Sequence, residues 1–293
     1  MGGQLKEVRN RISSVQSTQQ ITKAMKMVSA AKLRRAQDAI IQMRPYARKL
    51  QEMLSNIVSN SEGGTGMALA NERQVEKALL IVITSDRGLC GAFNANLIKL
   101  AKVTIAEKYS AQHKKGNVTI WNIGKKGYEH FVKNKYKADA TYKDIFHQLS
   151  FENVQKAAQA AMKAFEEKQF DAVEIVYSEF KNAATQRFTV ERFLPVPKAA
   201  TKVGATKADF IYEPVKEQLL AELMPKILNT QLYKAVLDSN ASEHGARMTA
   251  MDKATENAQE MLRTLKISYN RARQAAITTE LTEIVSGAAA LQG

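Results

Sequence analysis

Residues 84–94, with the sequence TSDRGLCGAFN, could bind a ligand because they join an apolar segment to a helical one. Free N–H groups in such a turn can hold a phosphate. Gly88 and Gly91, however, match neither a dinucleotide-binding loop nor a P-loop, and no Lys-Ser or Lys-Thr pair follows them. The pattern therefore favours a tight structural turn in which Asp86 caps local backbone, with phosphate binding as the alternative.

Cys90 lies in the same stretch and is the single cysteine of the chain. Because no histidine is near it in the sequence, we expect a packed small apolar side chain and not a nucleophile. A lone cysteine also excludes an intramolecular disulfide and a multi-cysteine zinc site. No two histidines lie within ten residues of each other, so we expect no metal held by histidine. The four are His113, His130, His147 and His244.

The elements that would hold this turn form a small Rossmann-like α/β domain, because strand-like and helical patterns alternate through the middle of the chain. Residues 61–66 and 195–207 look like hinges or exposed loops at its ends. Strands are predicted at 78–84, 118–123, 173–177 and 187–193, and helices at 94–109, after Gly127, and at 151–168 behind Ser150 as N-cap.

Long helices are predicted on both sides of this domain, since apolar or small residues recur at alternating spacings of three and four. Glycine and proline together number 19 of 293 residues, which also favours uninterrupted elements. Pro45 should kink or end the first helix. The seam residues are Leu5, Val8, Ile12, Val15, Leu33, Ala36, Ile40, Met43, Ala47, Leu50, Leu54 and Ile57, and Met248, Met251, Ala258, Leu262, Leu265, Tyr269, Ala272 and Ala276.

A polar stretch interrupts the first seam, and packing should change partner or twist there. Its seam positions are Gln19, Thr22, Lys26 and Ser29, while Ile21, Met25 and Val28 should move the apolar face sideways.

Each seam alone would leave an apolar stripe in water, so the two arms should pair as an antiparallel coiled coil. The sequence predicts three parts: an N-terminal helix at 1–60, the α/β domain with its linkers at 61–208, and a C-terminal helix at 209–293. Arms of 56 and 74 residues would leave an overhang of 18 residues, a single helix that ends in IVSGAAALQG.

The net charge of +14, from 43 basic and 29 acidic residues, indicates an anionic partner. Residues 1–60 carry 11 basic and 3 acidic side chains, whereas residues 209–293 carry 9 and 11. A coiled-coil arm that binds nucleic acid is therefore one possibility, although the acidic second arm argues against it. The basic side chains free for an acidic partner would be Lys23, Lys26, Lys32, Arg34 and Arg35, and candidates for contacting an outside socket are Arg271, Arg273 and Gln274.

Stretches at both ends and in the centre of the chain closely resemble the gamma subunit of the rotary, F-type ATP synthase. They are LKEVRNRISSVQSTQQITKAMKMVSAAKLRRAQ, SDRGLCGAFN, and the pair ARMTAMDKATENAQEML and YNRARQAAITTELTEIVSGAAAL. The resemblance implies a non-catalytic central-stalk rotor subunit, without catalytic residues, metal or cofactor. Such a subunit couples proton-driven rotation of a membrane ring to ATP synthesis or hydrolysis in the catalytic head.

The resemblance also implies partners and contacts. The arms would lie inside three alpha and three beta subunits, and the α/β domain would form a foot on the membrane ring of c subunits, beside the epsilon subunit. The expected location is the cytoplasmic face of a bacterial plasma membrane, with no nucleic acid and membrane contact only through partners. Arg273, Gln274, Thr278, Glu280 and Glu283 would contact beta subunits, Met25 and Arg247 would transmit torque, and Tyr212, Glu213 and Pro214 would form the foot contact. A small phosphate-ligand enzyme within residues 72–197 is a further alternative.

Overall fold

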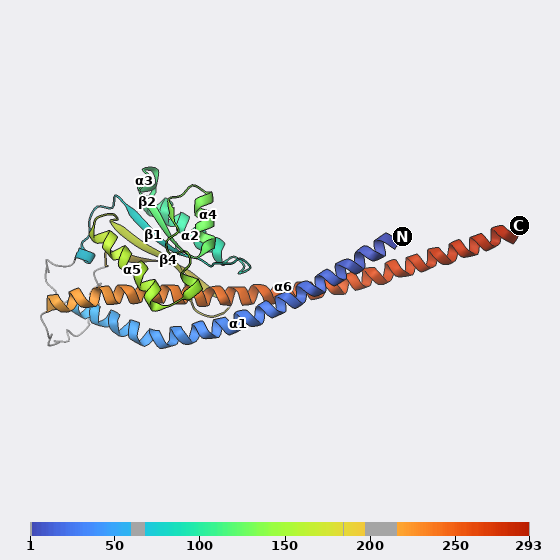
Figure 1. Cartoon of the computed structure of the whole chain (residues 1–293), viewed down its shortest axis with the longest axis horizontal. Coiled ribbons are helices and arrows are strands. Elements are labelled where there is room, and N and C mark those ends of the chain that lie inside the picture. Colours follow the sequence, from blue (N-terminus) through green and yellow to red (C-terminus); the bar gives the residue numbers. More distant parts are fainter. Residues whose placement is uncertain (1, 60–67, 184, 197–215, 293) are drawn as a thin grey trace. The chain divides into compact units, whose positions relative to one another are not determined.

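The computed structural model describes residues 2–59, 68–183, 185–196 and 216–292. Two long helices, α1 (Gly2–Ser59) and α6 (Lys216–Gln292), begin and end the chain, and a sheet region lies between them in the sequence (Figure 1). The chain divides into two compact units. The arm unit consists of Met1–Ser29 and Met248–Gly293, and the sheet unit is Ala30–Arg247, so each long helix contributes to both.

The sheet unit is built around five strands in the order β3-β2-β1-β4-β5. Strands β1 to β4 run parallel to their neighbours, and β5 is antiparallel to β4. The central strand β1 is buried along its whole length, as its apolar sequence ALLIVI predicts for a parallel strand covered on both faces. The strands are β1 (Ala78–Ile83), β2 (Val118–Ile123), β3 (Ala138–Asp139), β4 (Ala172–Phe180) and β5 (Gln186–Leu194).

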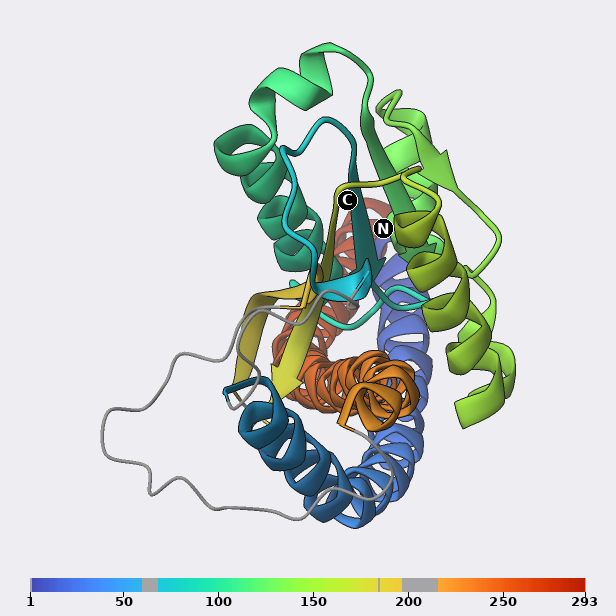
Figure 2. The same ribbon diagram turned by 90° about the vertical axis from the view of Figure 1, so that its left-hand side faces the viewer.

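Helices cover both faces of this sheet and give the unit three layers (Figure 2). On one face pack α2 (Phe93–Lys108) and α4 (Lys125–Lys133). On the other face pack α5 (Phe151–Glu166) and the first half of α6. The short elements are η1 (Ala68–Ala70), α3 (Ser110–Lys114) and η2 (Ile145–Gln148).

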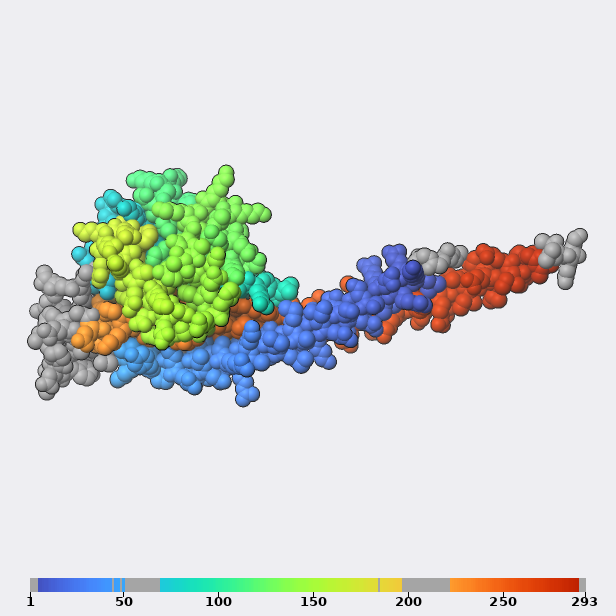
Figure 3. Space-filling model, viewed as in Figure 1, coloured from blue at the N-terminus to red at the C-terminus, as the bar shows by residue number. Residues whose placement is uncertain are grey.

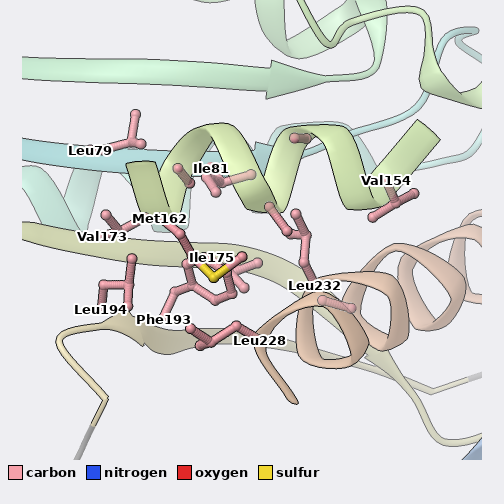
Figure 4. Close-up of a cluster of buried hydrophobic side chains, with 14 of the residues drawn as sticks. Leu79, Ile81, Val154, Met162, Val173, Ile175, Phe193, Leu194, Leu228 and Leu232 are labelled. Atoms are coloured by element: carbon pink, nitrogen blue, oxygen red, sulfur yellow. The ribbon is translucent and has the colours of Figure 1, made fainter. Parts of the chain in front are cut away.

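One hydrophobic core lies between the sheet, α5 and α6 (Figure 4). Phe165 of α5, Ile175 of β4 and Leu232 of α6 are fully buried in it. Removing each such side chain from water contributes roughly 1.5–3 kcal/mol to stability. Because α6 supplies part of this core, its first half is a structural part of the α/β fold and not a separate arm.

In the arm unit, α1 and α6 pack antiparallel in a single register. In each contacting pair the two residue numbers add up to 277 or 278, so Gly2 lies opposite Ala276. Residues 277–292 of α6 therefore extend past the N-terminal end of α1 as a single helix of 16 residues (Figure 3), close to the predicted 18. The pairs are Arg9 with Tyr269 at 3.0 Å, Thr22 with Thr255 at 2.8 Å, and Lys26 with Asp252 at 2.5 Å.

The predicted sideways shift of the apolar face in α1 is wrong. Ile21 and Val28 are 59% and 56% exposed, whereas Thr22 and Ser29 are buried. The polar seam residues can stay inside because they have partners: the Thr22 hydroxyl meets Thr255, and the Ser29 hydroxyl donates to the Met25 carbonyl at 2.8 Å. The seam therefore continues through the polar stretch on the same side of α1.

Most other predicted elements are confirmed to within a few residues. The hydroxyl of Ser150 accepts a hydrogen bond from the Asn153 N–H at 3.3 Å and caps α5 as expected. Pro45 does not end the first helix, since α1 continues to Ser59. Strand β3 was not predicted, because two residues are too few to form a hydrophobic pattern. The predicted division at residues 60 and 208 stays a prediction.

Candidate functional site

The turn after β1 is held by its own polar side chains. The Ser85 hydroxyl donates to the Arg87 carbonyl at 2.6 Å, and the Ser85 N–H donates to Asn94 Oδ1 at 2.9 Å. Cys90 is 1% exposed, and Asn94 Nδ2 lies 3.3 Å from its sulfur. The prediction of a packed cysteine in a structural turn is confirmed, whereas Leu89 stays 64% exposed at the rim of the turn.

The neighbouring turn after β2 uses the first N–H groups of α4 for contacts with the β1 turn. Lys125 N–H donates to Asp86 Oδ1 at 3.2 Å, Lys126 N–H to the Ser85 carbonyl at 3.1 Å, and Gly127 N–H to Thr84 Oγ1 at 2.9 Å. Asp86 thus caps the start of α4 and not its own turn, which corrects the prediction. These three donors, which could otherwise hold a phosphate, are already paired.

Two glycines that sequence reasoning missed allow this close approach. Gly124 has φ +103°, and a Cβ there would lie 2.2 Å from the Thr84 carbonyl oxygen. A Cβ at Gly127 would lie 2.8 Å from Thr84 Oγ1. The available signal was the sequence IGKKG directly after a predicted strand, which is typical of a backbone that must approach a neighbour.

Arg247 of α6 contacts the turn after β1. Its side chain is 10% exposed and forms a 2.5 Å ion pair with Glu243. The other guanidinium nitrogen donates to the carbonyls of Arg87 at 3.1 Å and Gly88 at 3.2 Å. Burial raises the pKa of the Glu243 carboxyl, and the Arg247 charge opposes this effect.

His244, next to this pair, makes folding sensitive to acid. Burial, with the charges of Arg247 and Lys32, lowers its pKa to about 4, whereas an unfolded histidine titrates near ~6.5. The unfolded chain therefore takes up the proton first, and stability that is full above about pH 6.5 is lost as the pH falls toward 4.

Protonation of His244 in the unfolded chain should lower the free energy of unfolding by about 2 kcal/mol between about pH 7 and pH 5. Urea titrations of the wild type and of His244→Gln at both pH values measure it, and the variant should lose about 2 kcal/mol less. Equal losses in the two proteins would contradict the assignment.

The predicted contact residues near the C-terminal end are solvent-exposed on α6. Arg271, Arg273 and Gln274, the candidates for contacting an outside socket, lie opposite the first turns of α1 and not beyond its end. Thr278, Glu280 and Glu283 lie past the end of α1, and Met25 is half-buried. The predicted foot contacts Tyr212, Glu213 and Pro214 lie outside the described residues.

Basic side chains line the surface of the sheet unit as well as α1. Lys23, Lys32, Arg34 and Arg35 are exposed, whereas Lys26 already pairs with Asp252. A groove of 710 Å³ between α2 and α4 has a mainly apolar lining, which also includes Lys99, Lys102, Lys126 and His130.

The described parts of the chain offer neither a metal site nor a membrane-spanning helix. Among them, no three His, Cys, Asp or Glu side chains gather where they could bind a metal. No helix of the same residues combines the length and the apolar character that a membrane span requires.

Comparisons with known proteins give consistent matches. A family model described as ATP synthase matches residues 4–291. The ATP synthase gamma chain of Cytophaga hutchinsonii is 55% identical over 290 residues, 98% of both chains, and that of Flavobacterium johnsoniae is 52% identical over 289 residues, 99% of both. A chain of the Euglena gracilis mitochondrial ATP synthase, solved as OSCP/F1/c-ring, shares the fold with a TM-score of 0.67 and 21% identity, covering 99% of this chain and 95% of its own.

Proposed function

Because this chain belongs to the family of ATP synthase gamma chains, we propose that it is the central-stalk rotor subunit of a rotary ATP synthase. It couples proton-driven rotation of a membrane ring to ATP synthesis, or ATP hydrolysis to pumping. A shaft that is not threefold symmetric presents a different face to each of three identical catalytic subunits, and rotation then cycles their nucleotide states.

The observation that carries this proposal is the uneven antiparallel pair. Past the end of α1, α6 is a single helix whose apolar side chains face water. A helix with such a stripe is suited to a socket in another protein. The exposed side chains are Ile277, Leu281, Ile284 and Val285, at 47% to 67%.

The proposed contacts follow the family resemblance. Thr278, Glu280 and Glu283, with Arg273 and Gln274, contact beta subunits of a head of three alpha and three beta subunits. Met25 and Arg247 transmit torque. The foot rests on the ring of c subunits beside the epsilon subunit, through Tyr212, Glu213 and Pro214.

The subunit itself is non-catalytic in this proposal, and nucleotide chemistry belongs to the beta subunits. The pairing of the Lys125, Lys126 and Gly127 N–H groups within the sheet unit supports this. The chain is peripheral on the cytoplasmic face of a bacterial membrane, which it reaches only through partners. The comparisons give no support to a nucleic-acid-binding arm, and a binding assay near physiological salt should detect no affinity.

Reconstitution tests the role. The purified chain, mixed with alpha and beta subunits of the same organism, should enter the complex in one copy and stimulate ATP hydrolysis. Native mass spectrometry and a coupled ATPase assay measure both properties. Failure to assemble would contradict the proposal.

A matched pair of double variants tests the contacts. Arg273→Ala with Gln274→Ala should reduce the stimulated ATPase rate about tenfold, because charge-assisted hydrogen bonds to the head contribute roughly 1.5–3 kcal/mol. Gln259→Ala with Arg263→Ala, exposed on the same helix, is the control and should leave the rate unchanged. Equal rates for the two double variants would remove the first pair from the contact.

A further inference from the structure

The guanidinium of Arg247 joins the helix α6 to the turn after β1. It is paired with Glu243 one helical turn earlier, and both side chains are 10% exposed. The carbonyls of Arg87 and Gly88, 160 and 159 residues away in the sequence, accept its remaining hydrogen bonds. All polar contacts of this guanidinium are therefore internal, and Arg247 is not available as a direct partner contact.

The turn has two different kinds of support. Its inner side is held by Ser85, Asn94 and Cys90, close to the end of β1. On its outer side Arg87, Gly88 and Leu89 are exposed, and the Arg87 carbonyl accepts from both the Ser85 hydroxyl and Arg247. Among the described contacts, the Gly88 carbonyl accepts a hydrogen bond from Arg247 alone. The tip of the turn at Gly88 is thus attached to α6, while Arg87 is attached both to α6 and to the end of β1.

The same side of α6 is anchored to the sheet just before Arg247. The Ser239 hydroxyl donates to the Ile83 carbonyl at 3.4 Å, and the Ser242 hydroxyl donates to the Ser178 carbonyl at 3.2 Å. These positions, with Glu243 and Arg247, follow the three-four spacing of one helix face. This stretch of α6 is therefore fixed to the strand ends and to the turn together.

We propose that Glu243 and Arg247 form a clamp that positions the exposed turn 86–89 on α6, so that the turn and this stretch of α6 move as one body. The functional effect of the clamp rests on the proposed stalk function. In a rotating shaft, a surface turn that contacts other subunits must keep its position relative to the helix that carries it. Arg247 acts through the turn as a positioning residue. Glu243 orients the guanidinium so that two of its nitrogens reach different acceptors, a geometry that the single ammonium of lysine does not provide.

The thiol of Cys90 reports the clamp in the isolated full-length chain. As the single cysteine, buried beneath the turn, it should react slowly with Ellman's reagent in the wild type. Arg247→Lys and Glu243→Gln should each raise the rate at least tenfold in the absence of denaturant. Arg263→Lys, on the exposed face of α6, is the matched control and should leave the rate unchanged. Unchanged rates in both clamp variants would overturn the proposal.

The ratio of protons pumped to ATP hydrolysed tests the positioning role in vesicles that hold the complete synthase. Arg247→Lys and Glu243→Gln should lower this ratio at least twofold, and Arg263→Lys should not. Faster thiol reaction with an unchanged ratio would make the clamp purely structural and overturn the positioning role. If the wild-type chain does not assemble into the synthase, the proposed stalk function is wrong. The thiol reaction rates of the isolated chain then still decide whether the clamp exists. If Arg247→Lys does not fold, Glu243→Gln alone decides by the same two measurements.

Discussion

Gly124→Ala is expected to lower the free energy of unfolding by more than about 4 kcal/mol, enough to leave the isolated chain largely unfolded. The residue has φ +103° and ψ 138°, a backbone conformation that costs an L side chain roughly 1–3 kcal/mol. The new Cβ would also lie 2.2 Å from the Thr84 carbonyl oxygen, so the β1 and β2 turns would have to separate. That separation would break the three hydrogen bonds between the start of α4 and the β1 turn. Urea unfolding followed by circular dichroism measures the change.

Gly116→Ala is the matched control. Gly116 also has a positive φ, +74°, but a Cβ there meets nothing within 4 Å. Gly116→Ala should therefore lower the free energy of unfolding only by the backbone strain, roughly 1–2 kcal/mol. Similar costs for the two variants would show that the contact with Thr84 does not restrict Gly124.

Arg73→Ala is expected to destabilise the chain by about 3 kcal/mol, because it leaves partly buried acceptors without a donor. The guanidinium donates to Asp171 Oδ1 at 2.6 Å and to the carbonyls of Phe165 at 2.8 Å and Phe170 at 2.5 Å. It also lies 4.4 Å from the centre of the Phe165 ring, a cation–π contact. Arg73 thus fastens the segment before β1 to the loop between α5 and β4.

The carboxyl of Asp171 shows how closely this site is organised. Burial alone would raise its pKa, but the N–H groups of Lys77 and Glu76 and the Arg73 guanidinium together lower it below the usual value. Arg187→Ala is the control, since its 3.6 Å pair with Glu179 is exposed and such pairs contribute roughly 0–1 kcal/mol. Thermal unfolding of both variants measures the difference, and equal shifts in Tm would contradict the role of Arg73.

The long periodic elements of this fold could be predicted from the sequence because their pattern is local. The seam spacing predicts both arms, their places at opposite ends of one chain predict antiparallel pairing, and the apolar run in β1 predicts a buried strand. Contacts between distant segments could not be predicted in this way. Gly124 meets Thr84 forty residues away, and Arg247 meets Arg87 across 160 residues. Only the three-dimensional structure brings these partners together.

The direction in which side chains of α1 point was the other feature that the sequence pattern predicted wrongly. Ile21 and Val28 were expected to draw the apolar face toward them, but helix packing favoured the polar residues in the seam because each found a partner. The same reasoning applies to Arg247, for which the family resemblance implies a role in torque but no specific contact. Its burial and its internal bonds define a role that the residue type alone does not.

The polar stretch of the seam sets how far the C-terminal helix protrudes. Sliding the helices by one heptad would place Thr22 opposite Leu262 and Lys26 opposite Ala258 or Gln259, and would leave both polar groups without their partners. Polar groups in a coiled-coil seam disfavour such alternatives and so select one register. Each heptad of slippage would change the protruding length by about 10 Å. Thr22 and Lys26 therefore fix the register of the two helices, so that α6 protrudes by the same length in every copy of the protein.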